Sequence, residues 1–143
     1  MIVYLDTSVL LRWLLNHNNA YSDFFSWDRC YVSELLWIES NRTLNRLRLE
    51  SRITDQDYSD LRLNLSEVYS TFQIIEIGDA VKKRAGEPFP TVIGTLDAIH
   101  LSSALFLSEE LRDASLVLLT HDVQLALAAV ACGLSVAGMG NRA

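Results

Sequence analysis

The sequence has few of the residues that organise small secreted, fibrous or membrane proteins. It holds only two cysteines, two prolines and six glycines among 143 residues. Cys30 and Cys132 lie in apolar stretches without CxxC spacing, so we expect reduced core residues rather than a disulfide or a metal-binding pair. No apolar run approaches the ~20 residues that span a bilayer. Because the N-terminus also lacks the features of a signal peptide, we expect a cytoplasmic protein.

Basic residues are also in the minority. Lys and Arg contribute 12 residues against 18 from Asp and Glu, which gives a net charge of −6. A general nucleic-acid-binding protein is usually basic, so any contact with a polyanion must depend on local clusters of positive charge. Two such clusters exist, and each is either a solvated helix face or a set of phosphate contacts. They are Arg42-Arg46-Arg48-Arg52 and Lys82-Lys83-Arg84.

Short β-type runs alternate with helical stretches along the chain, which we interpret as a single domain spanning residues 1–143. This alternation predicts an α/β fold in which helices cover a mainly parallel sheet. The predicted strands are 2–5, 30–32, 73–77, 115–119 and 134–136. The predicted helices are about 8–16, 33–49, 54–70, 96–108 and 122–132, with short ones near 21–25 and after Gly78. The second and third long helices are expected to form an αα hairpin beside the sheet.

Four acidic residues stand at the edges or in the middle of apolar segments: Asp6, Glu39, Asp97 and Asp122. Burying a carboxylate costs on the order of several kcal/mol unless it is paired or bound to a metal. No Lys or Arg is close in sequence to Asp97, and the nearest Arg to Asp6 is Arg12. If the fold brings the acids together, a hard divalent cation is their natural counter-charge.

The predicted elements place these acids at one edge of the sheet. Asp6 and Asp122 directly follow predicted strands, whereas Glu39 and Asp97 lie in the first turns of predicted helices. In a parallel sheet the strands end, and the following helices begin, at the same edge, so all four carboxylates can face one cleft. An acid at a helix start also favours the helix dipole, which remains an alternative explanation for Asp97 and Asp122. It explains Asp6 and Glu39 poorly.

The segments around these acids together resemble the PIN-domain nucleases, and most of all the VapC toxins of bacterial toxin–antitoxin pairs. The resemblance covers nearly the whole chain, and its most specific part is the Leu-Asp-Ala-Ile-His-Leu string. It implies a PIN-like three-layer α/β/α fold, with the four acids as metal-binding residues and Thr120 as a polar neighbour. The segments are Tyr4-Leu5-Asp6-Thr7-Ser8, Ser33-Glu34-Leu35-Leu36-Trp37-Ile38-Glu39, Thr95-Leu96-Asp97-Ala98-Ile99-His100-Leu101 and Leu119-Thr120-His121-Asp122.

The activity that this resemblance implies is hydrolysis of RNA with the help of Mg²⁺ or Mn²⁺, leaving a 5′-phosphate and a 3′-hydroxyl. We assign Asp6 and Asp97 as the main ligands of the ion. Asp122 and Glu39 are assigned to bind it through water or to hold a second ion. The resemblance also implies a homodimer restrained by a small VapB-like antitoxin, for which the αα hairpin with its aromatic residues is the predicted binding surface. Candidate RNA-binding residues are Arg42 and Arg46, on the helix face of Glu39, and Lys82, Lys83 and Arg84.

Several other residues and protein functions bear on this interpretation. His100 is interpreted as a hydrogen-bonding core residue rather than a metal ligand, and no role is assigned to His121. Thr7 and Ser8 either contact the metal water or a phosphate, or cap the next helix. An aspartyl-phosphate phosphatase would need a second Asp where Ser8 stands, and a receiver domain would need a Lys after the late strand. A catalytically inactive PIN-like module that binds RNA or protein remains an alternative, and the class of RNA stays open.

Overall fold

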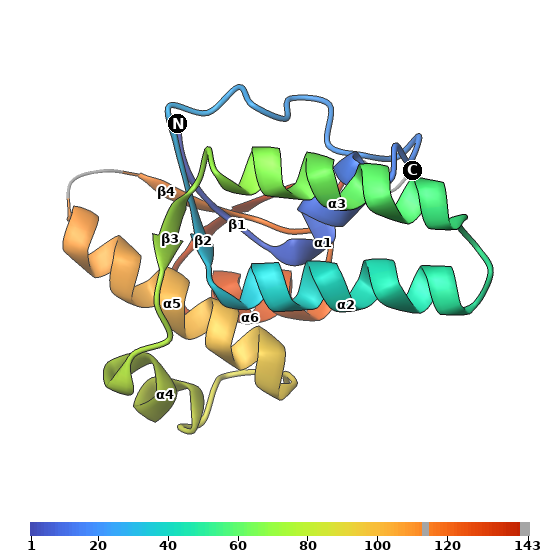
Figure 1. Ribbon diagram of the computed structural model, residues 1–143. Coiled ribbons are helices and arrows are strands. Elements are labelled where there is room, and N and C mark those ends of the chain that lie inside the picture. Colours follow the sequence, from blue (N-terminus) through green and yellow to red (C-terminus); the bar gives the residue numbers. More distant parts are fainter. Residues whose placement is uncertain (113–114, 141–143) are drawn as a thin grey trace.

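The computed structural model describes residues 1–112 and 115–140 (Figure 1). Within these residues, five parallel strands form one sheet in the order β3-β2-β1-β4-β5. Strand β1 lies in the centre, where Val3 is paired with Cys30 of β2 on one side and with Val117 of β4 on the other. The strands are β1 (Ile2–Leu5), β2 (Arg29–Ser33), β3 (Gln73–Ile75), β4 (Leu116–Leu119) and β5 (Ser135–Ala137).

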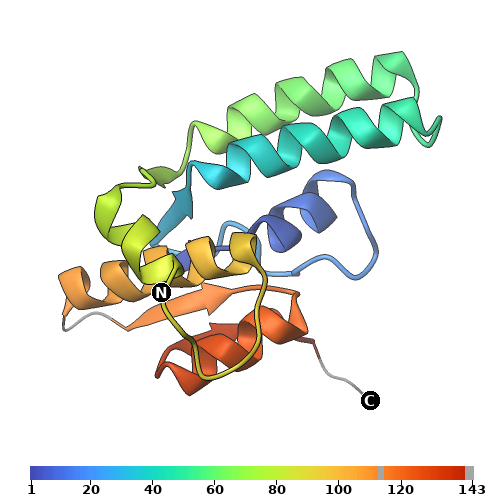
Figure 2. The same cartoon turned by 90° about the horizontal axis from the view of Figure 1, so that it is seen from below.

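Helices cover both faces of this sheet, which confirms the predicted three-layer α/β/α arrangement. Val3 and Leu5 of β1 belong to a core that also includes side chains of α1, α2 and α3. Tyr4, which points to the other face, belongs to a second core formed with α5 and α6. Figure 2 shows the α2–α3 hairpin and α6 on opposite sides of the strands. The helices are α1 (Thr7–Leu14), α2 (Leu35–Leu49), α3 (Asp55–Tyr69), α4 (Asp79–Ala85), α5 (Thr95–Leu111) and α6 (Val123–Ala131).

The segment between α1 and β2 differs from the prediction. In the described range 15–28 the chain forms turns, and the helix predicted near 21–25 is absent. Phe24 stacks on Trp13 with ring centroids 4.4 Å apart, and it contacts Trp27 edge-on. Phe25 has a φ of +75°, which a right-handed helix does not allow. Aromatic packing therefore fixes this segment in place of helical hydrogen bonds.

The strand order sets where a site can form. From β1 the chain crosses to β2 and β3 on one side of the sheet, and later returns to β4 and β5 on the other side. The carboxyl ends of β1 and β4 therefore flank the point at which the order of connections reverses, where open α/β sheets place their ligands. Cys30 is buried and Cys132 is partly buried, and both are free thiols, as predicted. Among the described residues, the helices are too short or too polar to cross a membrane.

Candidate active site

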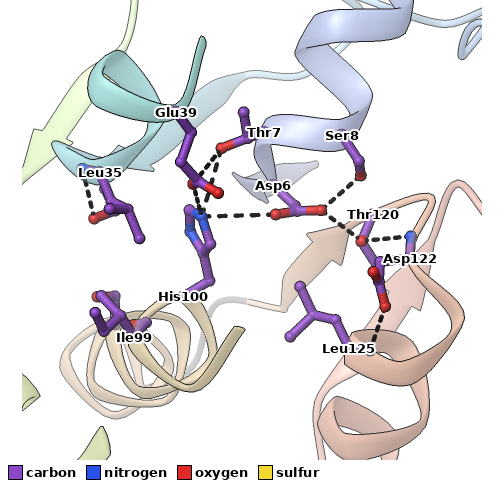
Figure 3. Close-up of polar contacts among 12 residues, drawn as sticks. Asp6, Thr7, Ser8, Leu35, Glu39, Ile99, His100, Thr120, Asp122 and Leu125 are labelled. Atoms are coloured by element: carbon purple, nitrogen blue, oxygen red, sulfur yellow. Dashed lines mark hydrogen bonds and ion pairs between the residues drawn. The ribbon is translucent and has the colours of Figure 1, made fainter. Parts of the chain in front are cut away.

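Asp6 lies directly after β1, at the reversal point of the sheet, and only 5% of its surface is exposed. One of its oxygens, Oδ2, accepts hydrogen bonds from Ser8 Oγ at 2.6 Å and from Thr120 Oγ1 at 2.8 Å (Figure 3). Thr120 directly follows β4, so hydroxyls from both sides of the reversal point hold this carboxylate. Ser8 therefore contacts an acid rather than capping α1, and the other oxygen of Asp6 points into the site.

Asp122 serves two structural roles beside Asp6. Its Oδ1 accepts a hydrogen bond of 2.9 Å from the backbone N–H of Leu125 and so caps the start of α6. Its own N–H donates to Thr120 Oγ1 at 3.0 Å, and the same hydroxyl donates to Asp6. The helix-start explanation of Asp122 is therefore confirmed, and Thr120 also links Asp122 to the buried carboxylate of Asp6.

Glu39 reaches the site from the second turn of α2. Its Oε1 accepts hydrogen bonds from Thr7 Oγ1 at 2.8 Å and from His100 Nε2 at 2.6 Å. His100 is only 1% exposed, and its Nδ1 lies 2.8 Å from the hydroxyl of Tyr4. The predicted core hydrogen bond of His100 is thus confirmed, but no sequence pattern indicates that its other nitrogen holds Glu39. The same Nε2 lies 3.7 Å from Asp6 Oδ1 (Figure 3).

The electrostatics of the site show that the four acids are close to one another. Burial and the neighbouring charges of Asp122 and Asp6 raise the pKa of Asp97, in the first turn of α5, to about 6. Burial opposes ionisation of Glu39, but the hydrogen bond and positive charge of His100 and the hydrogen bond from Thr7 together outweigh it and lower the pKa of this carboxyl. Burial lowers the pKa of His100, yet the hydrogen bond to Glu39 and the negative charges of Asp6, Glu39 and Asp97 together raise it overall. Among the described residues, no Lys or Arg forms an ion pair with any of these four acids.

The donor atoms suit a hard divalent cation, although the side chains are not arranged around one. Among the described residues, no three His, Cys, Asp or Glu side chains are grouped closely enough to hold an ion as they stand. Hydrogen bonds from Ser8, Thr120, His100 and the Leu125 N–H engage one oxygen each of Asp6, Glu39 and Asp122. The second oxygen of each engaged carboxylate has no hydrogen-bond partner among the described residues, and neither oxygen of Asp97 has one. These oxygens are hard donors, as Mg²⁺ and Mn²⁺ prefer.

The two basic clusters differ in their surroundings. Arg42 and Arg46 are exposed on α2 and line an open pocket of about 570 Å³ together with Asn41 and Asn45. Arg48, by contrast, lies over the ring of Tyr58 at 4.2 Å.

In the second cluster, Arg84 lies over the ring of Phe89 at 4.1 Å and donates to the carbonyl of Pro88. Lys82 and Lys83 are exposed on α4. Val81, on the same helix, lines a pocket with Phe106 and Leu107 of α5. Helix α4 thus packs on the second half of α5, whereas Asp97 lies in the first turn of α5.

The comparison with protein families is consistent with this geometry. The PIN domain matches residues 3–131, which is most of the chain and includes all four acids. The chain therefore belongs to the PIN-domain family. Among curated proteins, none matches this sequence.

Solved structures with the same fold cover nearly the whole chain. VapBC2 from Rickettsia felis, solved with a DNA fragment from its promoter, has a TM-score of 0.66 at 16% identity and covers 96% of this chain and 98% of its own. A toxin–antitoxin complex from Klebsiella pneumoniae has a TM-score of 0.64 at 19% identity, with 94% and 95% covered. VapBC-1 from nontypeable Haemophilus influenzae has a TM-score of 0.63 at 18% identity, with 96% and 97% covered. At these identities the likeness is one of fold.

Proposed function

We propose that this protein is a divalent-metal-dependent endoribonuclease. The observation that carries the proposal is the group of four carboxylates at the sheet's reversal point, which lacks Lys or Arg partners among the described residues. The charges of Asp122 and Asp6 help to raise the pKa of Asp97, and a bound cation would relieve this repulsion. Membership of the PIN-domain family supports the same interpretation.

The residues of the site have distinct parts in this proposal. Asp6 and Asp97 would be the main ligands of the ion, and Glu39 and Asp122 would bind through water or hold a second ion. A bound Mg²⁺ or Mn²⁺ lowers the pKa of water and neutralises charge on the phosphate. Around these ligands, Ser8 and Thr120 fix the carboxylate of Asp6.

Removing the metal is the direct test of this function. Chelator-treated protein should cleave no RNA, and Mg²⁺ or Mn²⁺ should restore cleavage. The ion should also stabilise the fold by about 2.7 kcal/mol at a hundredfold excess over Kd, which corresponds to a rise of several degrees in Tm. The Asp6→Asn Asp97→Asn double variant should show no such rise in a thermal melt. Cleavage in excess chelator would refute the mechanism, and an equal rise in the double variant would place the ion elsewhere.

Arg42 and Arg46 are proposed to hold the RNA backbone next to Glu39. Both are exposed, both lie on the helix that carries Glu39, and they share one pocket. Replacing both with Ala should weaken binding of single-stranded RNA and flatten its salt dependence by about 0.7 in log–log slope for each lost phosphate contact. Arg52→Ala, in the turn after α2, is the matched control and should leave the slope unchanged. If the wild type, the double variant and Arg52→Ala all showed the same salt dependence of RNA binding, Arg42 and Arg46 would be solvated surface charges.

We further propose that the protein acts as the VapC-type toxin of a toxin–antitoxin pair, as a homodimer restrained by a small VapB-like antitoxin. The similar structures include complexes of this kind, which supports a partner of the same class. The α2–α3 hairpin has a groove of about 400 Å³ in which the rings of Trp37 and Tyr69 lie 5.0 Å apart. Ile38, at its rim, is 52% exposed. An amphipathic helix of the antitoxin could bury these side chains and bring an Arg to the acids.

Co-expression tests the partner and the groove together. Expression of the protein alone should arrest bacterial growth, and co-expression with the neighbouring open reading frame should restore growth and yield a stable complex. Ile38→Glu should weaken that complex, whereas Leu63→Glu, at a site 62% exposed on α3 outside the groove, should not. Harmless expression of a protein that cleaves RNA, with no partner recovered, would remove the toxin assignment and leave the nuclease. Sedimentation of the free protein as a monomer would remove the homodimer.

A further inference from the structure

A cavity of about 680 Å³ lies on the far side of Asp6 from Glu39, between α1, the segment after it and the end of β5. It has the size of a small-molecule site. Ser8 connects it to the acids, because its hydroxyl donates to Asp6 and accepts from the backbone N–H of His121 at 3.0 Å. Arg12 follows Ser8 by four residues, about one helical turn or about 6 Å along α1. The polar side chains in its wall come from Arg12, Asn19, Tyr21, Ser22 and His121.

The charges in this cavity are not balanced. Arg12 is half-buried and forms no ion pair with any described residue. It lies close enough to His121 that burial and its positive charge together lower the pKa of this imidazole. A cation and an imidazole therefore line one cavity, in a protein whose net charge is −6. The guanidinium of Arg12, which has no counter-charge among the described residues, favours an anion beside it.

The glycine-containing segment after β5 forms the opposite wall. Gly138 has a φ of +92°, and a Cβ there would lie 2.7 Å from the carbonyl oxygen of Thr120. Only glycine therefore allows the backbone to pass this close to the end of β4. The carbonyl of Gly138 accepts from Nδ1 of His121, which fixes the orientation of the ring. Nε2 of His121 is left without a hydrogen-bond partner among the described residues.

We infer that this cavity binds a nucleotide of the RNA strand that neighbours the scissile phosphate, with Arg12 holding its phosphate. The inference rests on the proposed nuclease function and assigns a binding subsite to it. Ser8, which donates to Asp6, and Arg12 lie one turn apart on the same face of α1, so a strand extending from Asp6 along this face would reach the cavity. Asn19 and Ser22 supply neutral hydrogen-bonding groups for the sugar or base. A guanidinium is well suited to this role, since its fork of N–H donors matches phosphate oxygens.

Nuclear magnetic resonance with adenosine 5′-monophosphate locates the site without requiring cleavage. The backbone amide signals of His121, Gly138 and Gly140 should shift with nucleotide concentration, and adenosine without the phosphate should leave them in place. In Arg12→Gln, which keeps most of the aliphatic stem, the shifts should be lost. Arg52→Gln is the control and should respond like the wild type. Shifts that survive in Arg12→Gln, or that appear only elsewhere in the molecule, would overturn the subsite.

Binding of a 12-nucleotide unstructured RNA, measured by fluorescence anisotropy in an Asp97→Asn background, gives the second readout. Arg12→Gln should weaken binding by about tenfold and lower the salt slope by about 0.7, the contribution of one phosphate contact. If the wild type cleaves RNA but Arg12→Gln binds it as tightly as its parent, the subsite is refuted and the nuclease remains. If nothing is cleaved yet the nucleotide still shifts the three amides, the nuclease is refuted and the phosphate site remains.

Discussion

Asparagine at Asp6 or at Asp97 is expected to abolish RNA cleavage while the fold stays intact. Loss of an outer partner of a metal ligand already lowers affinity or activity by about 10–100-fold, so loss of a ligand should cost more than about a hundredfold. The Asp97 variant should also unfold at a higher temperature than the wild type when no metal is present. Burial and the charges of Asp122 and Asp6 disfavour its ionised form in the folded protein, and asparagine removes that penalty. Single-turnover cleavage and a thermal melt measure the two effects.

Asp60 provides the matched control for these substitutions. It lies exposed on α3, where its Oδ1 accepts from Gln56 Nε2, and it has no contact with the acid cluster. Asp60→Asn should therefore change neither cleavage nor its metal dependence. Full activity in Asp6→Asn or Asp97→Asn would contradict the assignment of these carboxylates as ligands. A variant that is both inactive and unfolded by circular dichroism would be uninformative on its own, and the second of the two variants then decides.

The sequence predicts the fold well because the elements that build it are patterned consistently. Each apolar run fits a buried strand, and the apolar spacing of α2, α3 and α5 fits a helix with one buried face. The sequence does not reveal the turns around Phe24 and Phe25, because aromatic contacts with Trp13 and Trp27, rather than local helical spacing, decide that segment. Local propensity cannot express such a contact. The same limit applies to the order β3-β2-β1-β4-β5, which depends on long-range pairing.

The sequence predicts the acids of the candidate site, but it does not predict the side chains that form hydrogen bonds with them. Each acid interrupts an apolar segment, and that conflict is visible in one sequence. The hydroxyls of Ser8 and Thr120 meet at Asp6 across 112 residues of chain, so no local pattern connects them. His100 is similar, since its partners Tyr4 and Glu39 come from β1 and α2. The sequence shows that His100 follows Asp97 by three residues. Only the structure shows that its ring lies between Tyr4 and Glu39.

His100→Ala is expected to lower the free energy of unfolding by about 3 kcal/mol. The imidazole is 1% exposed, so its removal leaves a cavity and also deprives two other groups of a hydrogen bond. The hydroxyl of Tyr4, on a fully buried ring, loses its contact with Nδ1, and Glu39 keeps only Thr7 as a partner. Each buried polar group left without a partner costs about 1–3 kcal/mol. Urea denaturation measures the change.

Ser102 offers an unusually close comparison on the same helix. Its hydroxyl is fully buried, like the ring of His100, but has no hydrogen-bond partner among the described residues. Ser102→Ala therefore removes a polar atom without breaking a hydrogen bond, and stability should stay within about 0.5 kcal/mol or rise. His100→Gln, which restores an N–H donor, should recover part of the loss caused by alanine. If His100→Ala and Ser102→Ala unfolded at the same urea concentration, the hydrogen bonds from His100 to Tyr4 and Glu39 would contribute nothing to stability. The hydrogen bond from Thr7 would then be the one that holds the carboxylate of Glu39 in place.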